Sequence, residues 1–289
     1  MARILIAGAT GLLGSSLTPY LSEKGHEVIT VGMRKEATFS ADLTNHHEAF
    51  KIINLSQPEL VINLIANTNV DLCESDINLA YRLNVLPIQN ICNVVNSLIP
   101  NAHVIHLSSD MLYDGSGPQK ESEIALRNIY SLSKFASELV VSKIQGTVLR
   151  TNFFGKSRCK DRVSFTDWIY QALLSEDHIN LFDNVYFSPL SMKTLCEMIN
   201  LVTDKRPIGI YNLGSRNGMS KADFAFVFAK FLNLSTEKMN RVPFKKLDNI
   251  TARRPNDMRM DSGLFEQELH IQLPNLIDEI KNVGALYNE

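Results

Sequence analysis

Cysteine is scarce in this sequence: the 289 residues include only four, Cys73, Cys92, Cys159 and Cys196. They are widely separated, so they form neither the paired spacing of a zinc site nor the Cys-x-x-Cys of a redox motif. This pattern is typical of reduced thiols in a cytoplasmic protein. The adjacent pair His46-His47 does not replace a metal motif, because neighbouring residues of a helix point in different directions. We therefore expect no metal site.

The sequence also has no strong excess of charge and no long apolar run. Lys and Arg number 29 and Asp and Glu number 31, for a formal net charge of -2, so nothing favours nucleic acid or an anionic membrane as a partner. No apolar stretch is long enough to span a membrane. Met1 leads directly into an apolar strand pattern, so we expect no signal peptide. The apolar content of 45% is that of a globular protein with a substantial core.

A glycine-rich turn follows the first apolar run. Gly8 and Gly11 follow the run at 3–7, and Gly14 lies at the start of an amphipathic helical pattern that begins at Leu12. Glycines let the backbone turn sharply and approach a pyrophosphate, and the helix that follows offers free N–H groups and a partial positive charge. A strand, a glycine turn and a helix in this order indicate a dinucleotide site. The alternative is a glycine-rich turn without a ligand.

Short apolar runs alternate with amphipathic segments over the first half of the chain, which predicts an α/β, Rossmann-like fold with helices on both faces of a doubly wound parallel sheet. After Arg150 the alternation becomes less regular. We predict an NAD(P)-binding domain over residues 1–150, which later segments rejoin, and a smaller α/β substrate-binding region over residues 151–289. The predicted strands are Arg3–Ala7, Glu27–Val31, Leu60–Leu64, His103–Leu107, Thr147–Arg150 and Gly209–Asn212, and the predicted helices are Leu12–Lys24, His46–Leu55, Asn78–Leu98, Ile129–Lys143, Ser164–Leu174, Lys193–Val202, Phe224–Leu232 and Asn275–Val283.

A phenol and an ammonium lie on one face of a predicted helix, because Tyr130 and Lys134 are four residues apart. A nearby ammonium favours the phenolate and so lowers a tyrosine pKa from its usual value of about 10. Ser108 and Ser109 end an apolar strand, where a hydroxyl can stabilise charge on a substrate carbonyl oxygen. The alternatives are a surface helix for the Tyr-x-x-x-Lys pair, a turn cap for Ser109, and a cofactor contact for Ser108.

With the glycine turn at 8–14, Tyr130 and Lys134, the sequence resembles the extended short-chain dehydrogenases/reductases. Finer matches are similar to their dTDP-4-dehydrorhamnose reductase branch. These matches are the Val-Ile-Asn segment with the later Thr-Asn-Val-Asp, the run Ser-Ser-Asp-Met-Leu-Tyr-Asp-Gly, and the late Ala-Arg-Arg-Pro, at 61–63, 68–71, 108–115 and 252–255.

The resemblance implies reduction of a nucleotide-linked 4-keto-6-deoxy sugar, as in the formation of dTDP-L-rhamnose for polysaccharide biosynthesis. It implies that Tyr130 is the proton donor, that Lys134 lowers the pKa of Tyr130 and binds the cofactor ribose, and that Ser109 holds the substrate oxygen. The cofactor-binding residues that it implies are Gly8, Thr10, Gly11, Leu12, Leu13, Gly14, Arg34, Asp42, Leu43, Leu64, Ile65, Ala66, Ser108, Tyr130 and Lys134. The substrate-binding residues that it implies are Thr68, Ser109, Asp110, Phe153 and Arg254.

The second predicted strand lacks the acidic residue that would favour the free ribose of NAD. Arg34 lies at its end instead and can meet a 2′-phosphate, so NADP(H) is favoured and NAD(H) is the alternative. Solvated loop charge is the usual fate of such an arginine. Asp42 has a second interpretation as a helix cap before His46. Arg254 and its neighbours suit a substrate diphosphate, or else form a basic surface loop.

Several positions depart from the branch pattern, among them Asn67, Met111, Leu190 and Phe153. They surround the expected sugar, so the identity of the sugar and of its nucleotide carrier stays open. The nucleotide sugar is the expected partner, and members of the family are often homodimers. Two alternatives remain: an epimerase or dehydratase that retains its NAD(P), and a non-catalytic regulatory subunit like that of methionine adenosyltransferase.

Overall fold

The structure, a computed structural model, describes residues 1–175, 177–244 and 251–288. The strands of the central sheet are β1 (Arg3–Ala7), β2 (Glu27–Gly32), β3 (Phe39–Ser40), β4 (Leu60–Asn63), β5 (His103–Leu107), β6 (Gly146–Thr151) and β11 (Gly209–Leu213). All seven run parallel, in the order β11-β6-β5-β4-β1-β2-β3. The strand order changes direction between β1 and β4, and ligands bind beyond the carboxyl ends of the strands at such a point.

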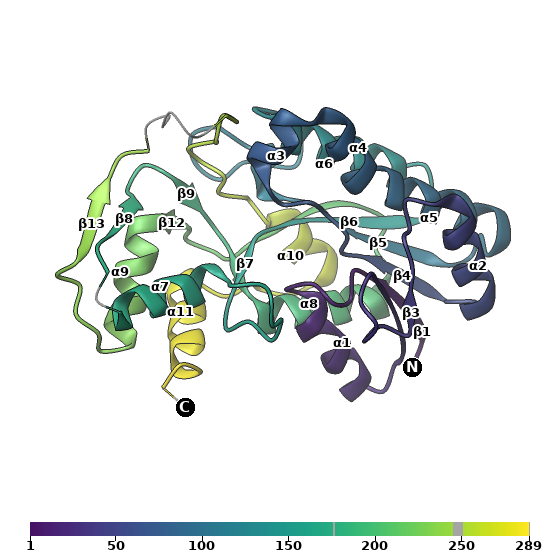
Figure 1. Ribbon diagram of the computed structural model, residues 1–289, viewed down its shortest axis with the longest axis horizontal. Helices are drawn as coiled ribbons and strands as arrows, with labels where there is room; N and C mark the ends of the chain where they lie inside the picture. The colour runs from purple at the N-terminus through teal and green to yellow at the C-terminus, as the bar shows by residue number, and fades with distance from the viewer. Residues whose placement is uncertain (176, 245–250, 289) are drawn as a thin grey trace.

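Helices cover both faces of this sheet. They are α1 (Gly14–Glu23), α2 (His46–Ser56), α3 (Val70–Ser75), α4 (Ile77–Asn84), α5 (Leu86–Leu98), α6 (Ile129–Val141), α8 (Met192–Lys205) and α10 (Gly263–Leu269). In Figure 1, α1, α8 and α10 lie below the sheet, and α2, α5 and α6 lie on the other side. The strands are therefore buried on both faces: Ile4 and Ile6 pack toward α1 and α8, whereas Leu5 and Ala7 pack toward α2 and α5.

A second lobe lies at the left of Figure 1. Its elements are β7 (Phe153–Phe154), α7 (Phe165–Leu174), β8 (Ile179–Phe182), β9 (Tyr186–Phe187), β10 (Leu190–Ser191), β12 (Met219–Ser220), α9 (Lys221–Phe231), β13 (Met239–Val242) and α11 (Leu276–Ala285). Short two-stranded pairs connect these elements, and aromatic rings fill the core between them. Phe224 packs edge-on against Phe154 with ring centroids 4.8 Å apart. The lobe therefore has its own apolar core beside the sheet.

The predicted fold class is confirmed, and the six predicted strands of the sheet begin and end within one residue of their predicted bounds, whereas the short edge strand β3 was not predicted. One helix prediction was wrong: the segment Asn78–Leu98 is two helices, with a break at Val85. Pro87 lies at the start of the second helix, where its missing N–H costs nothing, whereas the interior of one long helix would lose a hydrogen bond there. The helices α3 and α10 were not predicted.

The predicted boundary near residue 150 cuts through the sheet. The strand β11 pairs with β6, with Tyr211 opposite Leu149, and α8 packs on the same face as α1. The residues after 150 therefore supply an edge strand and two covering helices to the first lobe. Of the helices that the structure describes, none combines the length and the apolar character needed to span a membrane.

Candidate active site

A cavity of about 400 Å³ opens at the carboxyl edge of the sheet. It brings together predicted residues that lie far apart in the sequence, because β1, β4, β5 and β6 all end there. One side is the glycine turn, and the other is the face of α6 that carries Tyr130 and Lys134. The predicted residues that line it are Gly8, Gly11, Leu12, Leu13, Gly14, Leu64, Ala66, Thr68, Ser108, Ser109, Asp110, Tyr130, Lys134 and Phe153.

The glycine turn has the shape of a phosphate cradle. Gly8 has a φ of +84°, which side-chain-bearing residues rarely adopt. A Cβ on Gly14 would lie 2.5 Å from the carbonyl oxygens of Gly8 and Ala9, so only glycine fits where the turn enters α1. Among the described residues, the backbone N–H groups of Leu12, Leu13 and Gly14 have no acceptor. Free donors at a helix N-terminus favour an anion, so these residues fit a dinucleotide pyrophosphate.

A second cavity, of about 340 Å³, adjoins the outer side of the turn. It is lined by Thr10 and by the cationic side chains of Arg34, Arg158 and Lys160. Arg34 donates to Asp161 at 2.7 Å, and both side chains are largely exposed. The thiol of Cys159 donates to the Thr10 carbonyl at 3.4 Å, which holds the segment 156–163 against the glycine turn. No pattern in the sequence indicates that Arg158 and Lys160 join Arg34 here.

Three predicted cofactor residues line neither cavity. Leu43 is buried in the core beneath β2, and Asp42 accepts the backbone N–H of Thr44 at 2.9 Å. The helix-cap alternative for Asp42 was wrong, since Asn45 caps α2. Ile65 packs against Gly8 and so supports the turn from behind. Cofactor contact by these three residues stays a prediction.

The start of α6 is fixed by its cap. The side chain of Asn128 accepts the N–H of Ser131 at 2.8 Å, and the Ser131 hydroxyl in turn accepts the backbone N–H of Asn128, which is a capping box. Asn128 also donates to the carbonyl of Arg253 at 2.7 Å. The late Arg-Pro segment therefore helps to hold the turn of α6 that carries Tyr130.

The Tyr130 phenol is buried beside Ser109 and Asp110. Burial raises the pKa of Tyr130 to about 12, the Ser109 hydroxyl favours the phenolate, and the Asp110 carboxylate opposes it. Lys134, which we expected to lower the pKa of Tyr130, is not among the groups that shift it. Ser109 also accepts the N–H of Met111 at 3.2 Å, so the turn-capping alternative holds beside its position in the site.

Lys134 is buried and donates to the Leu107 carbonyl at 2.7 Å. Burial lowers its pKa to about 8, and the Glu138 carboxylate one turn further along α6 opposes that shift. The ammonium therefore lies at the end of β5, next to the cavity.

A buried ion pair that sequence reasoning missed lies behind Lys134. Arg150 on β6 donates to Glu138 at 2.6 Å, with both side chains almost completely buried. The hydroxyl of Ser108 donates to the same carboxylate at 2.5 Å, so its hydrogen points at Glu138; a cofactor contact for Ser108 stays a prediction. The one available signal was that Glu138 follows Lys134 at a helical spacing.

Polar side chains from distant segments gather next to Ser109 and Asp110. Asn152 donates to the buried Asp110 carboxylate at 2.6 Å, and burial raises the pKa of Asp110 to about 6. The predicted residue Arg254 donates to Asp71 at 2.6 Å, which ties the late segment to the start of α3. Lys221, at the start of α9, is an electrostatic neighbour of both Asp110 and Arg254. Lys221 was not predicted as a site residue.

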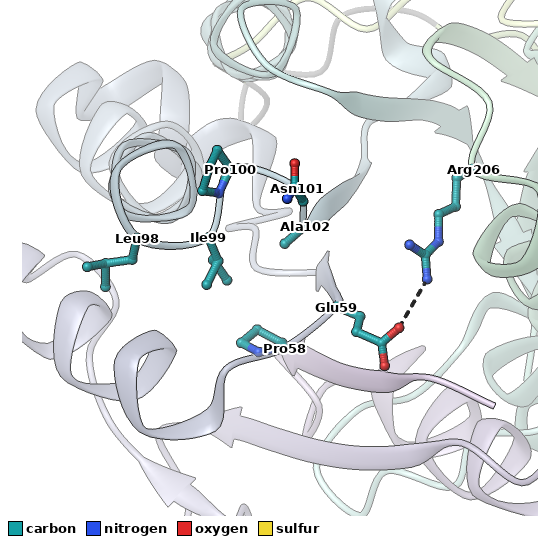
Figure 2. A pocket seen from close by; sticks show the side chains of 8 residues that line it. All are labelled: Pro58, Glu59, Leu98, Ile99, Pro100, Asn101, Ala102 and Arg206. Atoms are coloured by element: carbon teal, nitrogen blue, oxygen red, sulfur yellow. Dashed lines mark ion pairs between the residues drawn. The ribbon is translucent and has the colours of Figure 1, made fainter.

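A shallow pocket of about 460 Å³ lies at the opposite, amino edge of the sheet, between Pro58 and Arg206 (Figure 2). Its charged side chains, Glu59 and Arg206, pair with each other at 3.6 Å, and it lacks the glycine turn and the phenol.

All four cysteines are free and buried. No group of acidic, histidine or cysteine side chains suited to a metal ion occurs in the described part of the chain.

A Rossmann-like sheet whose glycine turn faces a Tyr-x-x-x-Lys helix defines the extended short-chain dehydrogenases/reductases. Within that class the model of the RmlD substrate binding domain matches residues 2–288, and the chain belongs to this family. It is 28% identical to dTDP-4-dehydrorhamnose reductase of Aggregatibacter actinomycetemcomitans, over 99% of each chain. It is 26% identical to the probable low-salt glycan biosynthesis reductase Agl14 of Haloferax volcanii, over 98% of each. The crystal structure of dTDP-4-dehydrorhamnose reductase from Bacillus anthracis in complex with NADP has a TM-score of 0.88 at 21% identity, over 99% of this chain and 98% of that one.

Proposed function

We propose that this protein is an NADPH-dependent reductase of a nucleotide-linked 4-keto-6-deoxy sugar, with dTDP-4-dehydrorhamnose as the first candidate substrate. One observation carries the proposal: the glycine turn and the Tyr130–Lys134 face of α6 line the same cavity. Its relatives support it, since the reductase from Aggregatibacter actinomycetemcomitans is similar over the whole chain.

The side chains fit the reduction direction. NADPH supplies the hydride, and the protein must then protonate the new alkoxide. Tyr130 suits this task because a phenol with a pKa near 12 is neutral, and so carries its proton, at physiological pH. We expect Ser109 to donate to the same oxygen. We expect Lys134, whose ammonium lies at the end of β5, to hold ribose hydroxyls of the cofactor.

The cavity beside Thr10 supports NADPH over NADH. Three cationic side chains line it, and guanidinium groups bind phosphate oxygens strongly. A 2′-phosphate must displace Asp161 from Arg34, at little cost because the pair is exposed. The NADP-bound relative from Bacillus anthracis agrees with this assignment, and NADH is the alternative donor.

The experiment is a panel of nucleotide keto sugars, with dTDP, UDP and GDP carriers, assayed by the fall in NADPH absorbance. We expect stoichiometric oxidation of NADPH with one 4-keto sugar. An epimerase or dehydratase that recycles its hydride would convert substrate without net oxidation. Tight NADPH binding without conversion of any sugar would favour the regulatory subunit instead.

The same proposal places the protein in the cytoplasm, where free nucleotide sugars are made, and expects a homodimer. In support of self-association, Ile77 and Tyr81 on α4 and Leu132 and Leu139 on α6 are exposed apolar side chains on helices that pack together. Light scattering during size-exclusion chromatography measures the assembly.

A further inference from the structure

Lys221 is placed by the first turn of α9. The preceding residue, Ser220, caps this helix by accepting the N–H of Asp223 at 3.0 Å. The backbone N–H of Lys221 donates to the Val185 carbonyl at 2.9 Å. Its side chain lies over two aromatic rings, with the ammonium 5.8 Å from the centroid of Phe165 and 6.0 Å from that of Phe187. The position of the charge is therefore fixed by both backbone and packing.

This ammonium is largely enclosed and has no counter-ion in contact. Among the described residues, no carboxylate or other oxygen acceptor lies within hydrogen-bond distance of it, whereas Arg241 and Arg254 each have one. Burial lowers the pKa of Lys221, the more distant Asp110 carboxylate raises it, and the Arg254 guanidinium lowers it. An enclosed cation without a contact partner is costly, which indicates that a ligand supplies the missing anion.

Arg254 provides a second cation near Lys221. Its guanidinium is anchored by Asp71 at 2.6 Å, and Asp71 is itself held by the N–H of Ala252 at 3.0 Å. The side chain is still partly exposed. Lys221 and Arg254 come from different segments and repel one another. An anion with two charges between them would turn that repulsion into attraction.

Lys221 and Arg254 do not line the cavity of the reaction centre, but Lys221 is an electrostatic neighbour of Asp110, which does. Asp110, the acidic neighbour of Lys221, contacts the hydroxyl of Ser109 at 3.4 Å, and Ser109 adjoins the phenol of Tyr130. The glycine turn lies across the cavity from these groups. In a nucleotide-linked 4-keto sugar, the diphosphate is attached across the ring from the ketone. It is also the one group in such a substrate with two negative charges.

We propose that Lys221 and Arg254 bind the diphosphate of the nucleotide sugar, with Lys221 as a binding residue that sets the position of the sugar ring against Tyr130. This inference rests on the proposed function for the identity of the ligand. It does not depend on catalysis, because a nucleoside diphosphate without a sugar carries the same group.

The test is calorimetric titration of the full chain with dTDP, UDP and GDP, each without cofactor. We expect Lys221→Met to weaken the tightest of these by roughly tenfold or more, as for the loss of a charge-assisted hydrogen bond. Lys221→Arg keeps the charge and should retain most of the affinity. The matched control is Lys230→Met, which removes an exposed lysine from the last turn of the same helix and should change nothing.

The two sources of a diphosphate are separated by titration with NADPH. The proposal requires that NADPH affinity stay unchanged in Lys221→Met, since the cofactor pyrophosphate belongs at the glycine turn. Equal weakening of NADPH would overturn the assignment to the substrate. Unchanged diphosphate affinity in a folded Lys221→Met variant would overturn it as well, as would the absence of binding by all three diphosphates.

Failure of the proposed function gives a different result. If the Lys221 variants behave as expected but no 4-keto sugar oxidises NADPH, the diphosphate site stands and the reductase assignment falls. If a sugar is reduced but Lys221→Met leaves both its KM and the diphosphate affinity unchanged, the reductase stands and the diphosphate site falls.

Discussion

Two walls of the cavity differ in the groups that they present to a ligand. The glycine wall, Gly8–Gly14, offers backbone N–H groups of one continuous turn. The polar wall consists of Asp110 and Asn152, which line the cavity, together with Lys221 and Arg254 behind them, so its side chains come from four separate segments. The first wall depends on local backbone geometry and the second on how distant segments pack. A substitution should therefore act on cofactor affinity at one wall and on the sugar at the other.

Tyr130 lines the cavity across from the glycine wall and beside Asp110, and the largest effect is expected there. Tyr130→Phe should lower turnover by about 10²–10⁴-fold, because it removes the proton donor and little else. Stopped-flow or steady-state NADPH oxidation measures the loss, and fluorescence titration of NADPH should show unchanged affinity. Turnover equal to that of the unmodified protein would remove Tyr130 from the mechanism.

Adding one methyl group at residue 14 should disrupt the glycine wall. A Cβ at residue 14 would lie 2.5 Å from two backbone carbonyl oxygens, so Gly14→Ala must push the turn apart. We expect NADPH affinity to fall by at least about tenfold, which corresponds to roughly 1.4 kcal/mol. Titration with a nucleoside diphosphate is the control, since the polar wall should keep its affinity. A loss at both walls would show that they are not independent.

The outer side of the glycine wall should distinguish the two dinucleotides. Arg34→Ala removes one cation from the cavity beside Thr10, so NADPH affinity should fall by about tenfold and NADH affinity should stay the same. Asp161→Asn is the matched control, because it breaks the Arg34–Asp161 pair but leaves the guanidinium in place. Equal losses for both dinucleotides would contradict a 2′-phosphate site.

The smallest effect concerns pH. Lys134 has a pKa lowered to about 8; the amine is charged below that value and neutral above it. If turnover needs the ammonium, kcat/KM should be level below about pH 7, fall to half near pH 8 and continue to fall above it. The Glu138 carboxylate raises this pKa, so Glu138→Gln should move the fall to lower pH. A flat profile up to pH 9 would show that the charge of Lys134 is not required.

The glycine wall and Tyr130 could be predicted because each depends on residues close together in sequence. The turn at Gly8–Gly14 and the pair Tyr130 and Lys134 are patterns of a few residues. The Glu138–Arg150 pair could not be predicted, because it depends on α6 packing against β6. Lys221 gives no local signal either: only the packing of the second lobe places its charge near Asp110.

The effect of Lys134 on the pKa of Tyr130 could not be predicted from spacing either. A helical spacing of four predicts that two side chains share a face, but it does not predict which acceptor the ammonium finds. The Leu107 carbonyl takes that bond, and burial then dominates the pKa of the phenol. Spacing gives neighbours, whereas desolvation depends on the whole fold.

The position of β11 has a consequence for the synthesis of the chain. This strand completes the edge of the sheet beside β6, although more than fifty residues, most of them in the second lobe, separate the two. While a ribosome is still translating the second lobe, β6 has an open edge with unpaired backbone groups, a state prone to wrong pairing. The first 150 residues, expressed alone, should therefore aggregate, and a gene split at that position should give two insoluble fragments rather than two independent modules.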